Sequence, residues 1–170
     1  MVRILSCLLS TLTVFVVGCS KESKPTASEN KQDEHAHGHN HEQNKMMIED
    51  FGSYHAGLTA HLSKKEGNEL DIVFETQDKE PKPVPLPLTK LIAKATRSGD
   101  DKTHTLEFEP AEKNERKDDS DGKCSRFTAK APWIKHEDML TVTLITTLDG
   151  KEKRVVWVDF NPKKFAHIDE

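Results

Sequence analysis

Long apolar runs are absent from this sequence except at its N-terminus. The run there extends from Ile4 to Val17 and is too short to span a bilayer as a helix, which needs about 20 residues. It follows a short, positively charged start at Arg3, which is typical of an export signal and not of a membrane anchor. We therefore expect residues 1–18 to form a signal peptide.

A basic charge excess is also absent, because 25 Lys and Arg stand against 29 Asp and Glu, and the formal net charge is -4. A mildly acidic chain has no positive field to attract nucleic acid, so nucleic acid is not an expected partner. Enzyme signatures are missing as well. The sequence contains no Gly-x-Ser-x-Gly, no His-Glu-x-x-His and no glycine-rich phosphate loop, so we expect no catalytic activity.

The end of the signal carries the sequence Val16, Val17, Gly18, Cys19, followed by polar Ser20. This pattern closely resembles the cleavage box of bacterial lipoproteins. The resemblance implies that the mature chain begins at Cys19, that this thiol is acylated, and that membrane lipid is a partner. Ser20 resembles outer-membrane sorting, so the implied location is the cell envelope, lipid-anchored and facing the periplasm, with the outer membrane favoured. The alternative is an ordinary secretory signal with an incidental Cys19.

Cysteine is scarce, with three in 170 residues, and Cys7 leaves with such a signal. With Cys19 lipidated, Cys124 is the one thiol that remains, which excludes an intramolecular disulfide. The stability of the mature protein must then come from a hydrophobic core.

Residues 19–45 contain no large aliphatic side chain and no aromatic one. Such a composition cannot bury enough apolar surface to offset the entropy of ordering, so we expect a disordered tether. As a flexible coil it would hold the following domain on the order of 30 Å from the lipid.

Four histidines alternate with small or polar residues inside this tether, namely His35, His37, His39 and His41. In an extended chain they lie on one side, about 6 to 7 Å apart, and Gly38 and Asn40 allow the bend that brings them to one ion. Imidazole nitrogen suits Zn, Cu(II) and Ni, so we predict that this histidine run binds such a metal. The alternative is a histidine-rich solvated linker with no metal role in the cell.

Met46 and Met47 follow the histidine run within a few residues. A thioether is a soft donor favoured by Cu(I), which makes both residues candidates for additional copper ligands. The alternative is hydrophobic packing at the start of the domain.

From residue 46 to residue 170 apolar and polar residues alternate with period two, which predicts strands. Asp149 and Gly150 give the strongest hairpin signal, and no stretch has a helical period. The result is an all-β prediction, an immunoglobulin-like antiparallel β-sandwich of about seven strands. The expected strands are Tyr54–Ser63, Leu70–Phe74, Leu88–Thr96, Thr103–Phe108, Cys124–Lys130, Leu140–Leu144 and Lys151–Phe160.

The alternation in the first of these strands points Ala56 and Leu58 to the core, and so places His55 and His61 together on the opposite face. These two histidines are too far apart to share an ion unless another strand contributes a ligand. We expect the scattered histidines of the domain to be surface or hydrogen-bonded residues.

The same parity predicts the faces of later side chains. In the fifth strand it turns Phe127 inward and Cys124 outward, although a buried, inert thiol is the default expectation for a lone cysteine. In the last strand it places Val158 and Phe160 on one face and Trp157 on the other.

The strings Tyr54, His55, Ala56 and Ser125, Arg126, Phe127, together with the lipoprotein box and the histidine run, are similar to envelope domains that accompany bacterial heavy-metal efflux adaptors. The helical hairpin and barrel domains of a true adaptor are missing. The resemblance therefore implies a periplasmic lipoprotein with a metal-binding or accessory role in envelope metal homeostasis, with envelope or efflux proteins as partners. The alternative is a non-catalytic interaction module of the envelope without a metal role.

Overall fold

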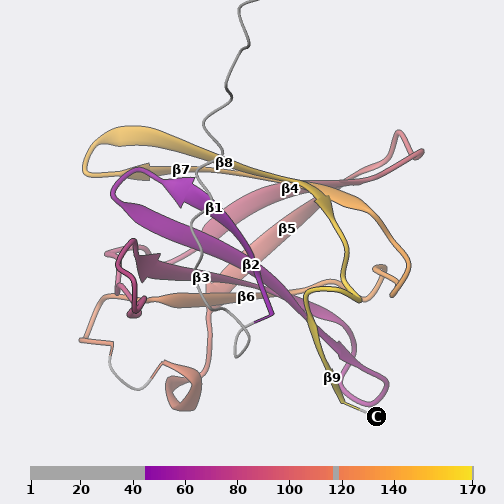
Figure 1. Ribbon diagram of the computed structural model, residues 1–170, viewed down its shortest axis with the longest axis horizontal. Helices are drawn as coiled ribbons and strands as arrows, with labels where there is room; N and C mark the ends of the chain where they lie inside the picture. The colour runs from indigo at the N-terminus through magenta and orange to yellow at the C-terminus, as the bar shows by residue number, and fades with distance from the viewer. Residues whose placement is uncertain (1–44, 117–118, 170) are drawn as a thin grey trace, which may run out of the picture. The chain divides into compact units, whose positions relative to one another are not determined.

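Eight antiparallel strands follow one another as hydrogen-bonded neighbours in the computed structural model, which describes residues 45–116 and 119–169 (Figure 1). The strands are β1 (Met47–Phe51), β2 (Tyr54–Ser63), β3 (Glu69–Thr76), β4 (Leu91–Arg97), β5 (Thr103–Pro110), β6 (Arg126–Lys130), β7 (Leu140–Leu148) and β8 (Lys151–Phe160). Their spatial order is β1-β2-β3-β6-β5-β4-β7-β8, and β9 (Ala166–Asp169) pairs in parallel with β2. Within the described ranges the one helical segment is a 3-10 turn at Lys113–Glu115, and no helix there has the length and apolar character to cross a membrane. The prediction of an all-β antiparallel fold is confirmed.

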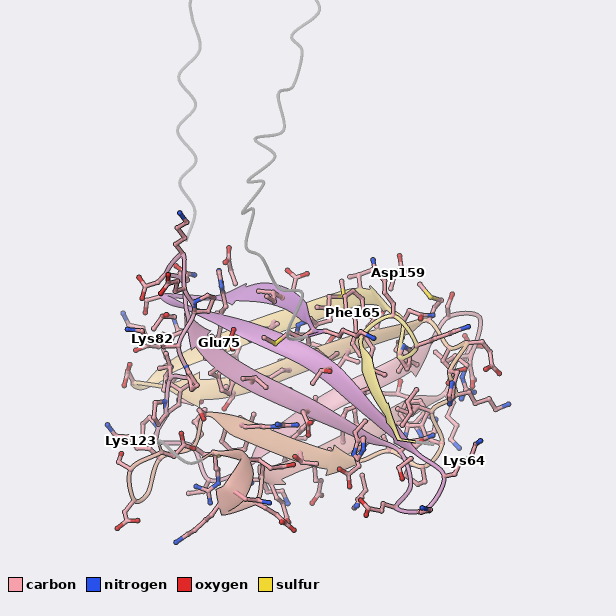
Figure 2. The ribbon with its side chains drawn as sticks, turned by 60° about the horizontal axis from the view of Figure 1, so that its bottom comes forward. Lys64, Glu75, Lys82, Lys123, Asp159 and Phe165 are labelled. Carbon is pink, nitrogen blue, oxygen red and sulfur yellow. The ribbon has the colours of Figure 1, made fainter. Side chains whose placement is uncertain are left out.

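The strands form two layers that face each other across the core (Figures 1 and 2). One layer contains β1, β2, β3 and β6, and the other contains β5, β4, β7 and β8. The layers are joined where the end of β5 pairs with β6 through Glu109 and Pro110. At the opposite side β8 packs beside β1, so the sheet is nearly closed on itself.

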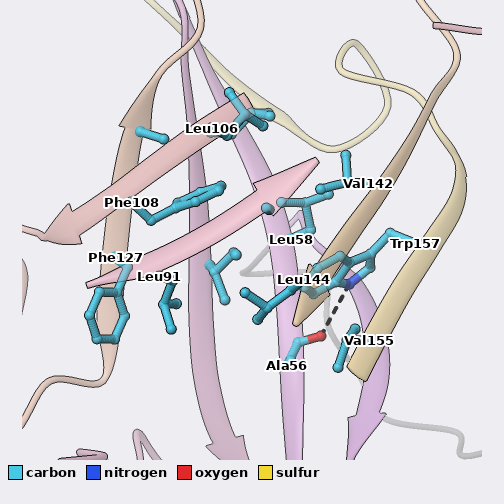
Figure 3. Close-up of a cluster of buried hydrophobic side chains, with 14 of the residues drawn as sticks. Ala56, Leu58, Leu91, Leu106, Phe108, Phe127, Val142, Leu144, Val155 and Trp157 are labelled. Carbon is cyan, nitrogen blue, oxygen red and sulfur yellow. Dashed lines mark hydrogen bonds between the residues drawn. The ribbon is translucent and has the colours of Figure 1, made fainter. Parts of the chain in front are cut away.

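Aromatic and branched side chains from both layers meet in the core (Figure 3). Trp157 of β8 is fully buried, and its Nε1 donates a hydrogen bond to the carbonyl oxygen of Ala56 on β2 at 3.3 Å. This bond satisfies the indole N–H, which would otherwise be costly to bury. It also connects the two layers on the side where β1 and β8 meet.

All seven predicted strands are present, as β2 to β8. The turn between β7 and β8 has positive φ at both central residues, 52° at Asp149 and 72° at Gly150, as a tight hairpin requires. The two strands that the sequence did not predict, β1 and β9, are short, and both pair with β2. The partner of β9 lies about a hundred residues earlier in the sequence, so β9 forms through a long-range contact that its own residue pattern does not indicate.

The predicted faces of β8 are wrong after Trp157. Trp157 and Phe160 are both buried, whereas Val158 is exposed. The register shifts here, since Leu140 pairs with Phe160 and Val142 pairs with Trp157, so β8 has one extra residue. Asp159 takes up this β-bulge with a φ of 57°, which reverses the parity of the strand and turns Phe160 inward.

Candidate functional site

The outer face of β2, β3 and β6 carries polar side chains that are buried although they point away from the core. His55 and Thr59 lie on β2, and Asp71 and Glu75 lie on β3. Register places His55 directly opposite Glu75, and Thr59 opposite Asp71. The prediction that His55 and His61 share this face is confirmed. The burial of His55 was not predicted.

Asp71 is the centre of a hydrogen-bonded ion pair on this face. Its Oδ2 lies 2.5 Å from Nη2 of Arg126, and its Oδ1 accepts a hydrogen bond from the Thr128 hydroxyl at 2.6 Å. Burial opposes the charge on Arg126, but attraction to Asp71 outweighs it, and the pKa of Arg126 is raised. Asp71 is 3% exposed, so these two partners replace the water that the carboxylate loses on burial.

Glu75 is a second buried carboxylate on the same face, and its surroundings differ from those of Asp71. Only 7% of its surface is exposed. Burial raises the pKa of Glu75 above its ordinary value. The side chain lines a cavity of about 160 Å³ together with Met46, Val73, Pro83 and Arg126. A buried carboxyl group with a perturbed pKa in a cavity marks a candidate binding site.

The chain enters the domain at the rim of this cavity, which Lys45 lines. The Thr59 hydroxyl lies 2.8 Å from the carbonyl oxygen of Lys45 and 2.8 Å from that of Phe165. It therefore joins the start of the domain to the segment that leads into β9. Figure 2 looks onto this face, with Glu75 towards one side and Phe165 towards the other.

Met46 is buried against Gly57, where an added Cβ would lie 2.3 Å from the Met46 sulfur. Met47 packs against the hydrophobic core. Both methionines therefore lie as expected from the alternative interpretation, hydrophobic packing at the start of the domain. Because Gly57 has no side chain, Met46 can pack this closely against β2.

The other predicted ligands, Cys19, His35, His37, His39 and His41, lie outside the residues that the structure describes. Across residues 45–116 and 119–169, no group of three or more His, Cys, Asp or Glu side chains could hold a metal ion.

Three histidines of the domain have local partners. Nε2 of His55 lies 3.6 Å from Asp50 on β1, and Nδ1 of His61 lies 3.9 Å from Glu69 on β3. A neighbouring strand thus contributes a carboxylate to each. His104 stacks on Trp133 with 3.8 Å between the ring centroids.

Cys124 is buried and belongs to the core, so the predicted outward orientation is wrong. Cys124 precedes β6 and forms an isolated bridge with Leu86. The alternation of side chains along β6 therefore does not determine which way Cys124 points. Its thiol donates to the carbonyl oxygen of Arg126 at 2.8 Å, and burial raises the pKa of Cys124. A raised pKa keeps the thiol protonated, which agrees with the expectation of an inert thiol.

A second, larger cavity of about 830 Å³ opens where β5 diverges from β6 beyond their pairing at Glu109 and Pro110. Its lining is acidic, and Lys130 is the one Lys or Arg in it. The glutamates that line it are Glu66, Glu69, Glu107, Glu109, Glu112 and Glu115.

Comparison with known proteins gave no match: no protein-family description, no curated protein and no solved structure is similar to this chain.

Proposed function

We propose that this protein is a lipid-anchored envelope protein whose histidine run binds a divalent transition metal beside a non-catalytic β-domain. The observation that carries the proposal is the run itself, His35, His37, His39 and His41, flanked by carboxylates at Glu34 and Glu42. Zn, Cu(II) and Ni all prefer imidazole nitrogen, and nearby carboxylates add oxygen donors and negative charge.

The position of the run supports this function. It ends four residues before Lys45, the first residue that the structure describes, because 45 minus 41 is 4. Acylation of Cys19 would hold the run close to the membrane, and the domain would follow it directly. Such a protein would capture or pass on metal at the envelope, which is the accessory role that the resemblance to efflux-associated domains implies.

Calorimetric titration of the mature chain with Zn, Cu(II) and Ni tests the proposal. We expect binding at pH 7.5 and a loss of most of the affinity at pH 5.5, since imidazole must lose its proton to bind and its ordinary pKa is about 6.5. The control replaces the run by H35S, H37S, H39S and H41S together and should release little heat at either pH. Equal affinity at both pH values, or unchanged binding by the control, would contradict the proposal.

A second candidate function, an interaction module for another envelope protein, is favoured by the acidic cavity between β5 and β6. Six glutamates in one cavity fit a cationic segment of a partner, because complementary charge speeds and orients association. In this case the histidine run would only solubilise the chain.

Deleting residues 33–42 separates the two functions. If the protein handles metal, cells with the deletion should show altered tolerance to zinc or copper. Unchanged tolerance would favour the interaction module, provided that partner capture persists in the deletion and is lost in an E107K/E109K variant.

A further inference from the structure

The outer face of the layer formed by β5, β4, β7 and β8 carries large apolar side chains that are open to water. Ile92 on β4, Ile145 on β7 and Val158 on β8 are 52%, 50% and 53% exposed. Half-buried Val156 continues this apolar surface along β8. Single exposed apolar residues are ordinary on a protein surface, but a contiguous group of them on one sheet face is typical of an interaction site.

The strand register arranges four side chains of this face in one row across the sheet. Glu107 of β5 pairs with Ile92, and Arg154 of β8 pairs with Ile145. Ile92 and Ile145 lie next to each other, one step beyond the last pair of the β4–β7 ladder. Glu107 and Arg154 are both exposed. The row therefore has an acid at one end and a base at the other, about 14 Å apart across three strand spacings, with two isoleucines between them.

We propose that this face binds the same face of a second copy of the chain, about a two-fold axis that runs along the strands between β4 and β7. Rotation about that axis reverses the row, so Glu107 of each copy faces Arg154 of the other, and Ile92 faces Ile145 of the other. The row is thus self-complementary, as a two-fold interface requires. Lys90 contacts Oε2 of Glu107 within one copy, and because a carboxylate accepts at both oxygens, Arg154 of the second copy can bind Oε1.

The neighbouring row supports the same arrangement. Across β5, β4, β7 and β8 it contains Thr105, Lys94, Thr143 and Val156. The rotation places Thr105 over Val156 of the other copy and Lys94 over Thr143 of the other copy. The one charged side chain of this row therefore meets a hydroxyl group and not a like charge.

The size of the face sets the strength of the contact. Four strands about 4.8 Å apart and roughly 30 Å long present about 600 Å² per copy. Two sheets pack face to face with about 10 Å between them and their strands nearly aligned, a separation that isoleucine and valine side chains fill. A total of about 1,200 Å² lies at the low end for specific complexes, so we expect a reversible dimer with a dissociation constant in the micromolar range.

Sedimentation equilibrium of the mature chain with Cys19→Ser, in the presence of a chelator, tests the proposal independently of metal binding by the histidine run. Glu107→Arg places two arginines opposite each other at both ends of the row and should raise the dissociation constant by about tenfold or more, because like charges repel. Arg154→Glu should do the same with two glutamates. Glu107 also lines the acidic cavity, so Arg154→Glu is the variant specific to this face. An equimolar mixture of the two variants should associate about as tightly as the parent chain, because each pair across the axis is then an Arg with a Glu.

Glu80→Arg is the matched control, because it makes the same charge change at an exposed position in the loop after β3 and should leave the dissociation constant unchanged. Ile145→Lys, at the centre of the face, should leave the chain folded by circular dichroism but monomeric. A parent chain that stays monomeric at about 1 mM, far above the expected dissociation constant, would overturn the proposal. So would a dimer that Glu80→Arg weakens as much as Arg154→Glu does, or two charge-reversal variants that do not associate when mixed.

Discussion

Replacing Asp71 with alanine is expected to lower the free energy of unfolding by about 3 kcal/mol. The substitution removes the partner of Arg126 at 2.5 Å and that of the Thr128 hydroxyl at 2.6 Å, and so leaves a half-buried guanidinium without a counter-charge. Breaking a buried pair typically costs about 3–5 kcal/mol, and the lower end applies because 29% of the Arg126 side chain reaches water. A typical domain has only about 5–15 kcal/mol of stability in total, so the loss should be plainly visible.

Urea unfolding of the mature chain measures this loss, with Glu107→Gln as the control. Glu107 pairs with Lys90 in an exposed position, 2.5 Å apart, so the solvent screens the interaction and its removal should hardly change stability. Asp71→Asn keeps an acceptor for the Thr128 hydroxyl, so its loss of stability should lie between those of Asp71→Ala and Glu107→Gln. If Asp71→Ala were no more destabilising than the control, the ion pair would not be a structural element of this face.

Replacing Cys19 with serine is expected to move the protein from the membrane fraction to the soluble fraction completely. Each acyl methylene buried in lipid contributes about 0.8 kcal/mol, and two or three chains together anchor a protein far more firmly than one. Serine offers no thiol for the thioether bond. Because the proposed anchor depends on this single atom, no partial effect is expected.

Fractionation of cells, with a salt wash of the membranes, measures the change. Cys124→Ser is the matched control, because that thiol is buried in the domain and its replacement should leave membrane association intact. Mass spectrometry of the native N-terminus gives an independent measurement. A Cys19→Ser chain that stays with the washed membranes, or a native chain without acyl groups, would rule out the lipid anchor.

Local pattern was sufficient for most of the strands. Period-two alternation identified β2 to β8, and the Asp149–Gly150 dipeptide identified the β7–β8 turn, because both signals depend only on neighbours in the chain. The bulge at Asp159 could not be read in this way, since an extra residue in β8 is defined only against its partner β7. The orientation of Phe160 was wrong for that reason.

The candidate site shows the same division. The sequence alone determined that position 55 lies on the outer face of β2, because parity within a strand is a local property. It also determined the composition of the tether and its histidine run, on which the proposed metal function depends. Only the tertiary structure decided that Asp71 and Glu75 on that face are buried, Asp71 with Arg126 and Thr128 as partners and Glu75 at the lining of a cavity. The groups that cover them, Met46 and Arg126, come from distant parts of the chain, and the free energy of burying a charge depends on what surrounds it and not on its neighbours in sequence.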